Sequence, residues 1–355
     1  MGDDALRADL LGATCPLPIL DHQQIVLGHG SGGKLTAELI EKLFIPAFRN
    51  PYLDALDDQA VLSIGGSRIA FTTDSFVVTP IFFPGGDIGR LAVNGTINDL
   101  AMSGARPLYL SSAFILEEGL ASDDLRRVVD SMRLAAAEAG VLVVTGDTKV
   151  VDRGKGDQIF ITTTGIGIIE KPVRISACLA QPGDVVILSG FIGDHGVAIL
   201  SQRENLSFDG EIASDTAPLH ELVAAMLGAS LDIHCLRDPT RGGVATTLNE
   251  IASRSHVGIE IDETAIPVRD TVRGACETLG MDPLYIANEG KLVAVVAADA
   301  ANRVLAAMQE HAHGRYARVI GRVVSAHAGM VLMRTQIGGT RMLDVMFHEP
   351  LPRIC

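Results

Sequence analysis

The sequence is poor in basic residues and has no long apolar run, and each absence excludes a class of protein. Its 355 residues include 29 lysines and arginines against 43 aspartates and glutamates, which gives a formal net charge of −14. Such an acidic protein is unsuited to a nucleic-acid or anionic-membrane surface as its main partner. The longest uncharged apolar candidates, such as residues 159–169, run for eleven residues, whereas a membrane-spanning helix needs about 18. We therefore expect no nucleic-acid partner and no membrane segment.

Clustered cysteines are also absent. The five cysteines stand apart, without a CxxC pair or the His and Cys spacing of a zinc site. Scattered cysteines in an odd number are typical of reduced thiols, so we expect a cytoplasmic protein. The first residues are acidic where a secretory signal needs positive charge, and two early prolines interrupt the apolar part that follows.

The chain is long enough for about two domains, and apolar periodicity predicts helices and strands mixed in both halves. Turn-forming residues place the boundary near 172–182. The expected organisation is a flexible leader over 1–24, one domain over 25–172, a second over 173–345 and a mobile tail over 346–355. Two prolines make that tail extended rather than helical.

Local patterns predict individual elements as well. In the first half we expect strands over residues 77–83 and 141–145, the latter ending at Gly146. A helix is expected over 122–139, with Ser122 as its N-cap. In the second half, the Gly-Asp-His-Gly segment 193–196 is expected to follow a strand.

Carboxylates recur at the ends of predicted strands in the first half. Asp58, Asp74, Asp99 and Asp147 are the candidates for a metal site, because magnesium prefers hard oxygen ligands and often bridges carboxylates to a nucleotide triphosphate. Any one of them could equally be a turn or capping aspartate. Residue types alone leave both interpretations open.

A glycine-rich segment, residues 28–34, almost has the spacing of a P-loop. It departs from that motif because Leu35 stands where a hydroxyl side chain belongs and no convincing strand precedes it. A flexible loop that brings Gly30, Gly32, Gly33 and Lys34 to phosphate groups is one interpretation. A hinge before the first helix is the other.

Three polar segments interrupt the apolar second half, at residues 193–196, 237–243 and 288–291. The second of them begins a predicted helix and is a candidate anion site. Glu289 is either a general base or an exposed capping residue. His195 is either catalytic or a structural hydrogen-bonding group.

Cys355 is the last residue of the sequence. Ten extended residues reach roughly 33 Å, so a thiol on this arm can cross a domain and move between active sites. Arg353 can partly offset the effect of the terminal carboxylate on the thiol. An incidental frayed end is the alternative.

The ordered motifs resemble those of the HypE family of hydrogenase maturation proteins. These are carbamoyl dehydratases of the aminoimidazole-ribonucleotide-synthetase-like (PurM-like) ATP-binding superfamily. The resemblance runs from about Ile25 to Cys355 and leaves out residues 1–24. It includes HGSGG (29–33), TDSFVV (73–78), FFPGGDIG (82–89), NDLAMSGA (98–105), ILEEG (115–119), GDTKV (146–150), GDHG (193–196), RDPTRGG (237–243), NEGKL (288–292) and LPRIC (351–355).

The resemblance implies an N-terminal α/β domain that binds ATP and magnesium, beside a C-terminal α+β domain. The N-terminal domain is expected to pair with its twin in a homodimer through a β-barrel-like interface. By motif match, the metal ligands come from Asp58, Asp74, Asp99 and Asp147. The residues expected to bind ATP are Gly30, Gly32, Gly33, Lys34, Asp74, Asn98, Asp147, Thr148 and Lys149.

In the family, a HypF-type partner carbamoylates the terminal thiol, here that of Cys355. The thiocarboxamide is then dehydrated to a thiocyanate, and its cyanide passes to iron held by a HypC–HypD-type complex for the NiFe hydrogenase centre. Glu289 is expected to be the base, with Lys149 and His195 assisting. Two alternatives remain: a kinase or synthetase of the same superfamily acting on a diffusible substrate, and a non-enzymatic maturation adaptor.

Overall fold

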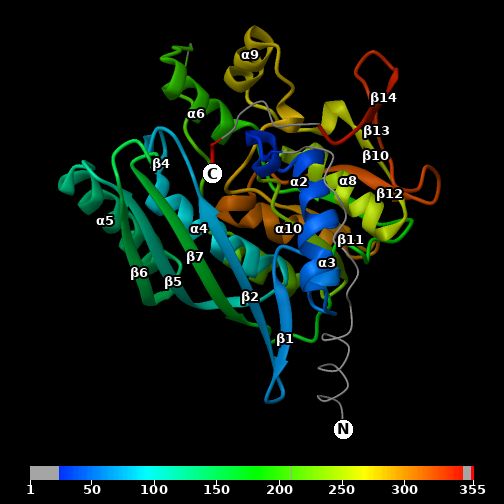
Figure 1. Cartoon of the computed structure of the whole chain (residues 1–355). Helices are drawn as coiled ribbons and strands as arrows, with labels where there is room; N and C mark the ends of the chain where they lie inside the picture. The colour runs from blue at the N-terminus through cyan, green and yellow to red at the C-terminus, as the bar shows by residue number, and fades with distance from the viewer. Residues whose placement is uncertain (1–23, 209, 347–352) are drawn as a thin grey trace.

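Two β-sheets flank a shared layer of helices in the computed structural model, which describes residues 24–208, 210–346 and 353–355 (Figure 1). The first half supplies a five-stranded sheet in the order β1-β2-β7-β5-β6. All its neighbours are antiparallel except β5 and β6, which are parallel and joined by the crossover helix α5. The elements are β1 (Ala60–Ile64), β2 (Ser67–Phe76), β5 (Arg106–Glu117), β6 (Leu142–Val151), β7 (Ile159–Ile168), α4 (Ile88–Met102) and α5 (Ser122–Glu138).

This first sheet has one covered face and one open face. Helices α4 and α5 lie on the covered face (Figure 1), where alternate residues of β2 such as Ala70 and Thr72 are buried. The intervening residues point outward, as the two-residue period of a strand requires. One cross-strand row on the open face consists of four large apolar side chains: Phe71, Ile166, Tyr109 and Leu142, all exposed.

Short elements surround the sheet. Before β1 the chain forms η1 (Leu27–Gly30), α2 (Lys34–Leu39), the π-helical η2 (Ile40–Phe44), α3 (Ile45–Phe48) and η3 (Leu53–Ala55). Between β2 and α4, the strands β3 (Phe82–Phe83) and β4 (Gly86–Asp87) form a small hairpin.

The second half forms a seven-stranded mixed sheet, in the order β14-β13-β10-β12-β8-β11-β9. Its strands are β8 (Val185–Leu188), β9 (Ile233–Arg237), β10 (Gly258–Asp262), β11 (Val293–Val296), β12 (Arg318–Val324), β13 (Val331–Arg334) and β14 (Thr340–Leu343). Its helices are α6 (Asp194–Glu204), α7 (His220–Ala229), α8 (Gly243–Ser255), α9 (Asp270–Leu279) and α10 (Ala301–Glu310), with the short η4 (Glu263–Ala265), η5 (Pro283–Tyr285) and η6 (Ala312–Gly314). Helices α7 and α10 pack on one face of this sheet and α8 on the other.

One apolar cluster joins the two halves. Leu100 and Ala101 of α4 are fully buried together with Leu222 and Met226 of α7. Because interiors of this kind are close-packed, α4 fixes the first sheet against the second half.

The structure corrects several local expectations. The segment 77–83 is not a continuous strand: Val78 makes a single bridge to Ile354, and only Phe82–Phe83 pairs regularly. Strand β6 continues through Gly146 to Val151, because its parallel pairing with β5 extends over that whole length and overrides the local Gly-Asp turn signal. Residue 122 is the first residue of α5 rather than its cap.

The Gly-Asp-His-Gly segment follows strand β8, as expected, and it opens helix α6 with Gly193 at the N-cap in a left-handed conformation. The expected domain boundary falls in the irregular stretch between β7 and β8. The expected leader, apart from residue 24, and residues 347–352 of the expected tail lie outside the described residues. Within the described part of the chain, every helix is too short or too polar to cross a bilayer.

Candidate active site

Three carboxylates from distant parts of the chain converge between the two halves. Oxygen atoms of Asp58, Asp99 and Asp238 all lie within 4.8 Å of one another. Asp58 precedes β1, Asp99 is on α4 and Asp238 follows β9. Asp74 of β2 lines the same cavity as Asp99, and its negative charge acts on that residue. The contact between α4 and the second half is what brings these segments together.

This carboxylate cluster (Asp58, Asp74, Asp99 and Asp238) contains more negative charge than its surroundings neutralise. Burial raises the pKa of each of the four carboxyl groups, that of Asp238 to about 6, and mutual repulsion raises it further for Asp58, Asp99 and Asp238. Arg237 compensates in part, because its guanidinium lies 2.9 Å from Asp58 Oδ1. The other oxygen of Asp58, Oδ2, is buried without a hydrogen-bond partner. A buried acceptor of this kind is costly unless a cation or donor meets it.

The carboxylate cluster lines a cavity of about 650 Å³, which we call the acidic cavity. This volume is within the range of about 300–1,000 Å³ that is usual for small-molecule and cofactor sites. The lining also includes Gly32, Gly33, Arg241, Glu289 and Cys355. Acidic side chains, the basic side chain of Arg241 and the thiol-bearing Cys355 therefore line the same cavity.

The glycine loop borders this cavity as expected, although not with every predicted residue. Gly32 has φ +80°, and a Cβ there would lie 2.7 Å from Cβ of Arg241, so only glycine fits. Gly30 instead lines a second cavity of about 680 Å³, and its carbonyl accepts a hydrogen bond from Arg241. Lys34 is exposed and forms an ion pair with Asp344, with 2.8 Å between Nζ and Oδ2. It lines neither cavity.

Glu289 is buried on the wall of the acidic cavity, with its Oε1 lacking a hydrogen-bond partner. Burial, together with the nearby charges of Asp238 and Asp215, raises its pKa well above the usual range. The backbone of Glu289 is held at both ends: its N–H donates to Asp215 Oδ1 at 3.0 Å and its carbonyl accepts from Asn98 at 3.1 Å. Because Glu289 is buried, the alternative interpretation of this residue as an exposed capping glutamate is wrong.

Asn98 makes backbone hydrogen bonds rather than lining the acidic cavity. Its amide nitrogen donates to the carbonyls of Ala217 and Glu289, and its oxygen accepts from the N–H of Leu219 at 2.8 Å. The side chain is 1% exposed and is not part of either cavity wall. The nucleotide contact expected for Asn98 stays a prediction, and in this structure its side chain positions the loop that carries Glu289.

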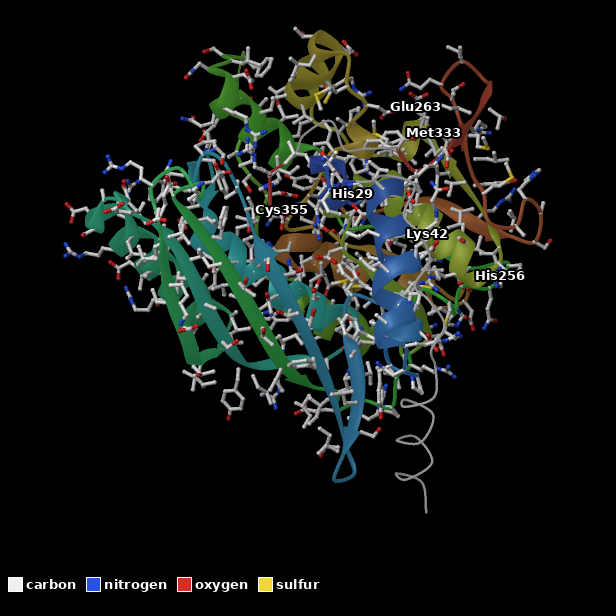
Figure 2. All side chains as sticks on the ribbon, in the orientation of Figure 1. His29, Lys42, His256, Glu263, Met333 and Cys355 are labelled. Atoms are coloured by element: carbon white, nitrogen blue, oxygen red, sulfur yellow. The ribbon has the colours of Figure 1, made fainter. Side chains whose placement is uncertain are left out.

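Cys355, which is labelled in Figure 2, contributes to the lining of both cavities. Its carbonyl accepts a hydrogen bond from the N–H of Val77, just after β2, at 3.0 Å. The preceding residue, Ile354, is buried in the core of the first half. His195 is also buried, and its Nε2 lies 2.7 Å from the carbonyl oxygen of Ile354. In this arrangement the end of the chain occupies a defined place beside Glu289 and the carboxylate cluster.

The Gly-Asp-Thr-Lys segment of β6 lies elsewhere. Asp147 and Lys149 form an exposed ion pair with 2.8 Å between Oδ2 and Nζ, and Thr148 between them is exposed too. The strand register aligns Asp147 with Ala113, Thr162 and Ser75, which places it on the open face. Strand β6 is three strands from β2, about 14 Å at roughly 4.8 Å per strand. Within one chain, this segment does not join the carboxylate cluster.

Sequence reasoning missed Asp238, Arg237 and Arg241, although all three lie in a segment that it singled out. The segment was interpreted as a helix N-terminus, with backbone N–H groups as its functional part. The relevant signal was an aspartate directly after a strand, here Asp238 after β9. Strand β9 was not predicted, so that signal could not be recognised.

Replacing Asn98 with leucine is expected to destabilise the fold by about 2–4 kcal/mol, since three buried backbone groups lose their partner. Chemical denaturation measures this loss. Asn302→Ala, on the exposed side of α10, is the control and should change stability by less than about 0.5 kcal/mol. Equal stability of the two variants would contradict the positioning role of Asn98.

Comparisons with known proteins agree with this architecture. Residues 56–169 match the family model "AIR synthase related protein, N-terminal domain", and residues 181–333 match "AIR synthase related protein, C-terminal domain". The carbamoyl dehydratase HypE of Azotobacter vinelandii is 56% identical over 336 residues, which cover 95% of this chain and 98% of that protein.

Two solved structures are similar throughout. The crystal structure of a HypE–HypF complex matches with a TM-score of 0.83 and 50% identity, covering 87% of this chain and 99% of that one. A HypE structure in complex with ATP matches with a TM-score of 0.79 and 53% identity, covering 94% and 100%. Identity at this level over nearly the whole length means that the chain belongs to the HypE family of carbamoyl dehydratases, with a PurM-like two-domain fold.

Proposed function

We propose that this protein uses ATP to dehydrate a carbamoyl group carried on the sulfur of Cys355, which converts a thiocarboxamide into a thiocyanate. The observation that carries the proposal is the acidic cavity, whose wall includes Cys355, Glu289 and the carboxylate cluster. Family membership and the ATP complex of a relative support the same activity. The nitrile then leaves as cyanide for the iron centre of a NiFe hydrogenase.

The reaction requires a poor leaving group to be activated. The oxygen of S–C(=O)–NH₂ does not depart at neutral pH, and ATP supplies the γ-phosphoryl group that lets it leave as phosphate. The carbon–oxygen bond breaks, the two nitrogen protons are removed and the carbon–nitrogen triple bond forms. A substrate tethered to Cys355 is already in the cavity, so no diffusional encounter is needed.

We assign the removal of a nitrogen proton to Glu289. Its carboxyl group is buried, and a raised pKa makes the ionised form a stronger base than an ordinary glutamate. Arg241 supplies positive charge between the cavity's acids, since its charge acts on both Asp74 and Glu289. Preorganised positive charge at this position stabilises negative charge that develops on the transferred phosphoryl group.

The donor set fits a magnesium ion. Asp58 Oδ2 is a buried oxygen without a partner, and carboxylates within 4.8 Å of one another are hard ligands that suit this metal. Asp58, Asp99 and Asp238 would hold the ion, with Asp74 beside them. When bound, magnesium neutralises phosphate charge during the transfer.

Asp238→Asn is expected to weaken magnesium–ATP binding at least about tenfold, measured by calorimetry. The same change should leave the metal-free protein equally or more stable to heat, since it removes one charge from a cluster of like charges. Asp123→Asn on the exposed surface of α5 is the control. Unchanged affinity for magnesium–ATP would contradict the assignment.

Glu289→Gln tests the chemistry. The variant should accept a carbamoyl group on Cys355 and fail to lose water, because glutamine cannot take the proton. Intact-protein mass spectrometry distinguishes the carbamoylated and dehydrated forms. Cys355→Ala is the control and should show neither adduct while still binding ATP. Normal dehydration by Glu289→Gln would exclude it as the base, and substrate-dependent ATP turnover by Cys355→Ala would favour a diffusible substrate instead.

We further propose that the protein acts as a homodimer in which the Gly-Asp-Thr-Lys segment serves the partner subunit's site. Edge strand β6 exposes Leu142, Val143 and Val144, and the open face exposes further apolar side chains. A long apolar edge strand usually needs a cover, and a second copy of the sheet provides one. Across such an interface, Asp147 and Lys149 can approach a cavity that they do not reach in their own chain.

Mixed dimers test this arrangement. A Lys149→Ala subunit and a Cys355→Ala subunit are each expected to be inactive as homodimers. Mixed in equal amounts, they should recover about a quarter of wild-type dehydration, because half of the dimers then contain one complete site. Lack of any recovery, with heterodimers verified by mass, would place Lys149 with the thiol of its own chain and overturn the proposal.

Two partners follow from the chemistry. A HypF-type carbamoyltransferase must load Cys355, and a relative has been crystallised with HypF. A HypC–HypD-type iron carrier must accept the cyanide. Both steps need the thiol outside the acidic cavity, whereas dehydration needs it inside.

A further inference from the structure

We propose that His195 is a positioning residue, which holds the end of the chain so that the sulfur of Cys355 faces Glu289. This inference rests on the proposed function for the purpose of that sulfur, although the docking itself is a matter of geometry alone. The residue is 0% exposed, and within the described residues it lines neither cavity. It therefore acts through the chain terminus rather than by contact with substrate.

The last three residues are held by their backbone. The carbonyl of Arg353 accepts from Arg203 Nη2 at 2.6 Å and from the N–H of Thr79 at 3.3 Å. The carbonyl of Ile354 accepts from His195 at 2.7 Å, and that of Cys355 accepts from the N–H of Val77 at 3.0 Å. Recognition through carbonyls fixes the path of the chain and leaves the thiol side chain for chemistry.

The hydrogen bonds define the protonation state of His195. A carbonyl oxygen only accepts, so Nε2 must carry a proton. Nδ1 lies 2.8 Å from Ser214 Oγ, and in a neutral ring protonated at Nε2 it has no proton and accepts from the serine hydroxyl. Burial lowers the pKa of His195, which favours this neutral form. The ring is further fixed by an edge-to-face contact with Phe83, at 5.7 Å between centroids.

The contact from His195 to the terminus is made by a fully buried side chain. The donors of Val77 and Thr79 belong to the backbone, and Arg203 is partly exposed, so water can replace it. A buried carbonyl that loses its donor has no such replacement. His195 therefore decides whether the docked position of Ile354 is favourable.

His195 and Glu289 are also connected through the hydrogen bonds of Asn288. Gly193, the N-cap residue of helix α6, donates its N–H to Asn288 Oδ1 at 2.8 Å. Asn288 is the residue before Glu289, and its amide nitrogen is bound in turn to the carbonyls of Pro239 and Ile286. The residue that holds the terminus and the proposed base are thus tied to each other through one buried asparagine.

The test compares two substitutions by their effect on thiol reactivity. His195→Phe keeps the ring and its packing but removes the donor, whereas His195→Gln keeps a donor near the position of Nε2. Full-length protein is treated with iodoacetamide, and alkylation of Cys355 is followed by peptide mass spectrometry. The exposed Cys178 is the internal reference, and the buried Cys235 reports unfolding.

We expect His195→Phe to raise the ratio of Cys355 to Cys178 alkylation about fivefold to tenfold, the effect of one lost hydrogen bond. His195→Gln should stay near the wild-type ratio. A wild-type ratio for His195→Phe, or an equal rise for both variants, would overturn the proposal. If alkylation of Cys235 shows that His195→Phe unfolds, Ser214→Ala decides: it removes only the group that fixes the tautomer, and should raise the ratio less but measurably, whereas no rise would refute the positioning role.

The two proposals fail separately. If wild-type protein never yields the dehydrated adduct, the proposed function is wrong, while the alkylation ratios still report docking. If the ratios do not respond to His195, the terminus is held otherwise, and the dehydration chemistry is unaffected.

Discussion

The organising constraint of this molecule is a group of four acids buried together with too little positive charge. Asp58, Asp74, Asp99 and Asp238 come from four separate segments, and each has a raised pKa in the absence of a further cation. Such a cluster opposes folding unless packing elsewhere compensates. The apolar contact between α4 and α7 supplies that packing, and it also fixes the cavity that the acids line. Apolar packing elsewhere in the chain thus offsets the cost of burying these acids, and the resulting site is suited to binding a cation.

The same core explains which segments of the chain contribute residues to the site. Helix α4 contributes Asp99 to the cavity and Asn98 to the backbone of the Glu289 loop, so adjacent residues place the acids and the base. The end of the chain pairs with the segment after β2 through a bridge between Ile354 and Val78. Strand β6 holds its polar segment on the open face of the sheet. In our proposal one subunit provides a thiol, a base and a carboxylate cluster, and its partner subunit provides a lysine from this segment.

Much of this arrangement follows from the sequence, for identifiable reasons. The long helix α5 was predicted within one residue at each end, because burial on one face leaves a clear pattern. Asp58, Asp74 and Asp99 were recognisable as acids in an apolar setting. Asp238 was not, since β9 is short and its strand character depends on pairing with β11. Tertiary pairing likewise carries β6 through a sequence that resembles a turn.

The role of some residues depends on contacts that no local pattern encodes. Asn98 is a polar residue of a type that is common in ligand-binding sites. Its three hydrogen bonds nevertheless go to segments more than a hundred residues away. From the sequence alone, His195 is equally an acid–base group or a structural hydrogen-bond donor. The position of the Ile354 carbonyl distinguishes the two roles and favours the structural donor.

The central claim is that the sulfur of Cys355 and the carboxylate cluster act in one space. Electron–nuclear double resonance tests it most directly, on protein with Mn²⁺ and ATP bound and a ¹³C-labelled carbamoyl group on Cys355. The account predicts a resolved ¹³C coupling to the manganese ion in the docked state. Absence of any such coupling, with metal, nucleotide and adduct all verified as bound, would contradict it.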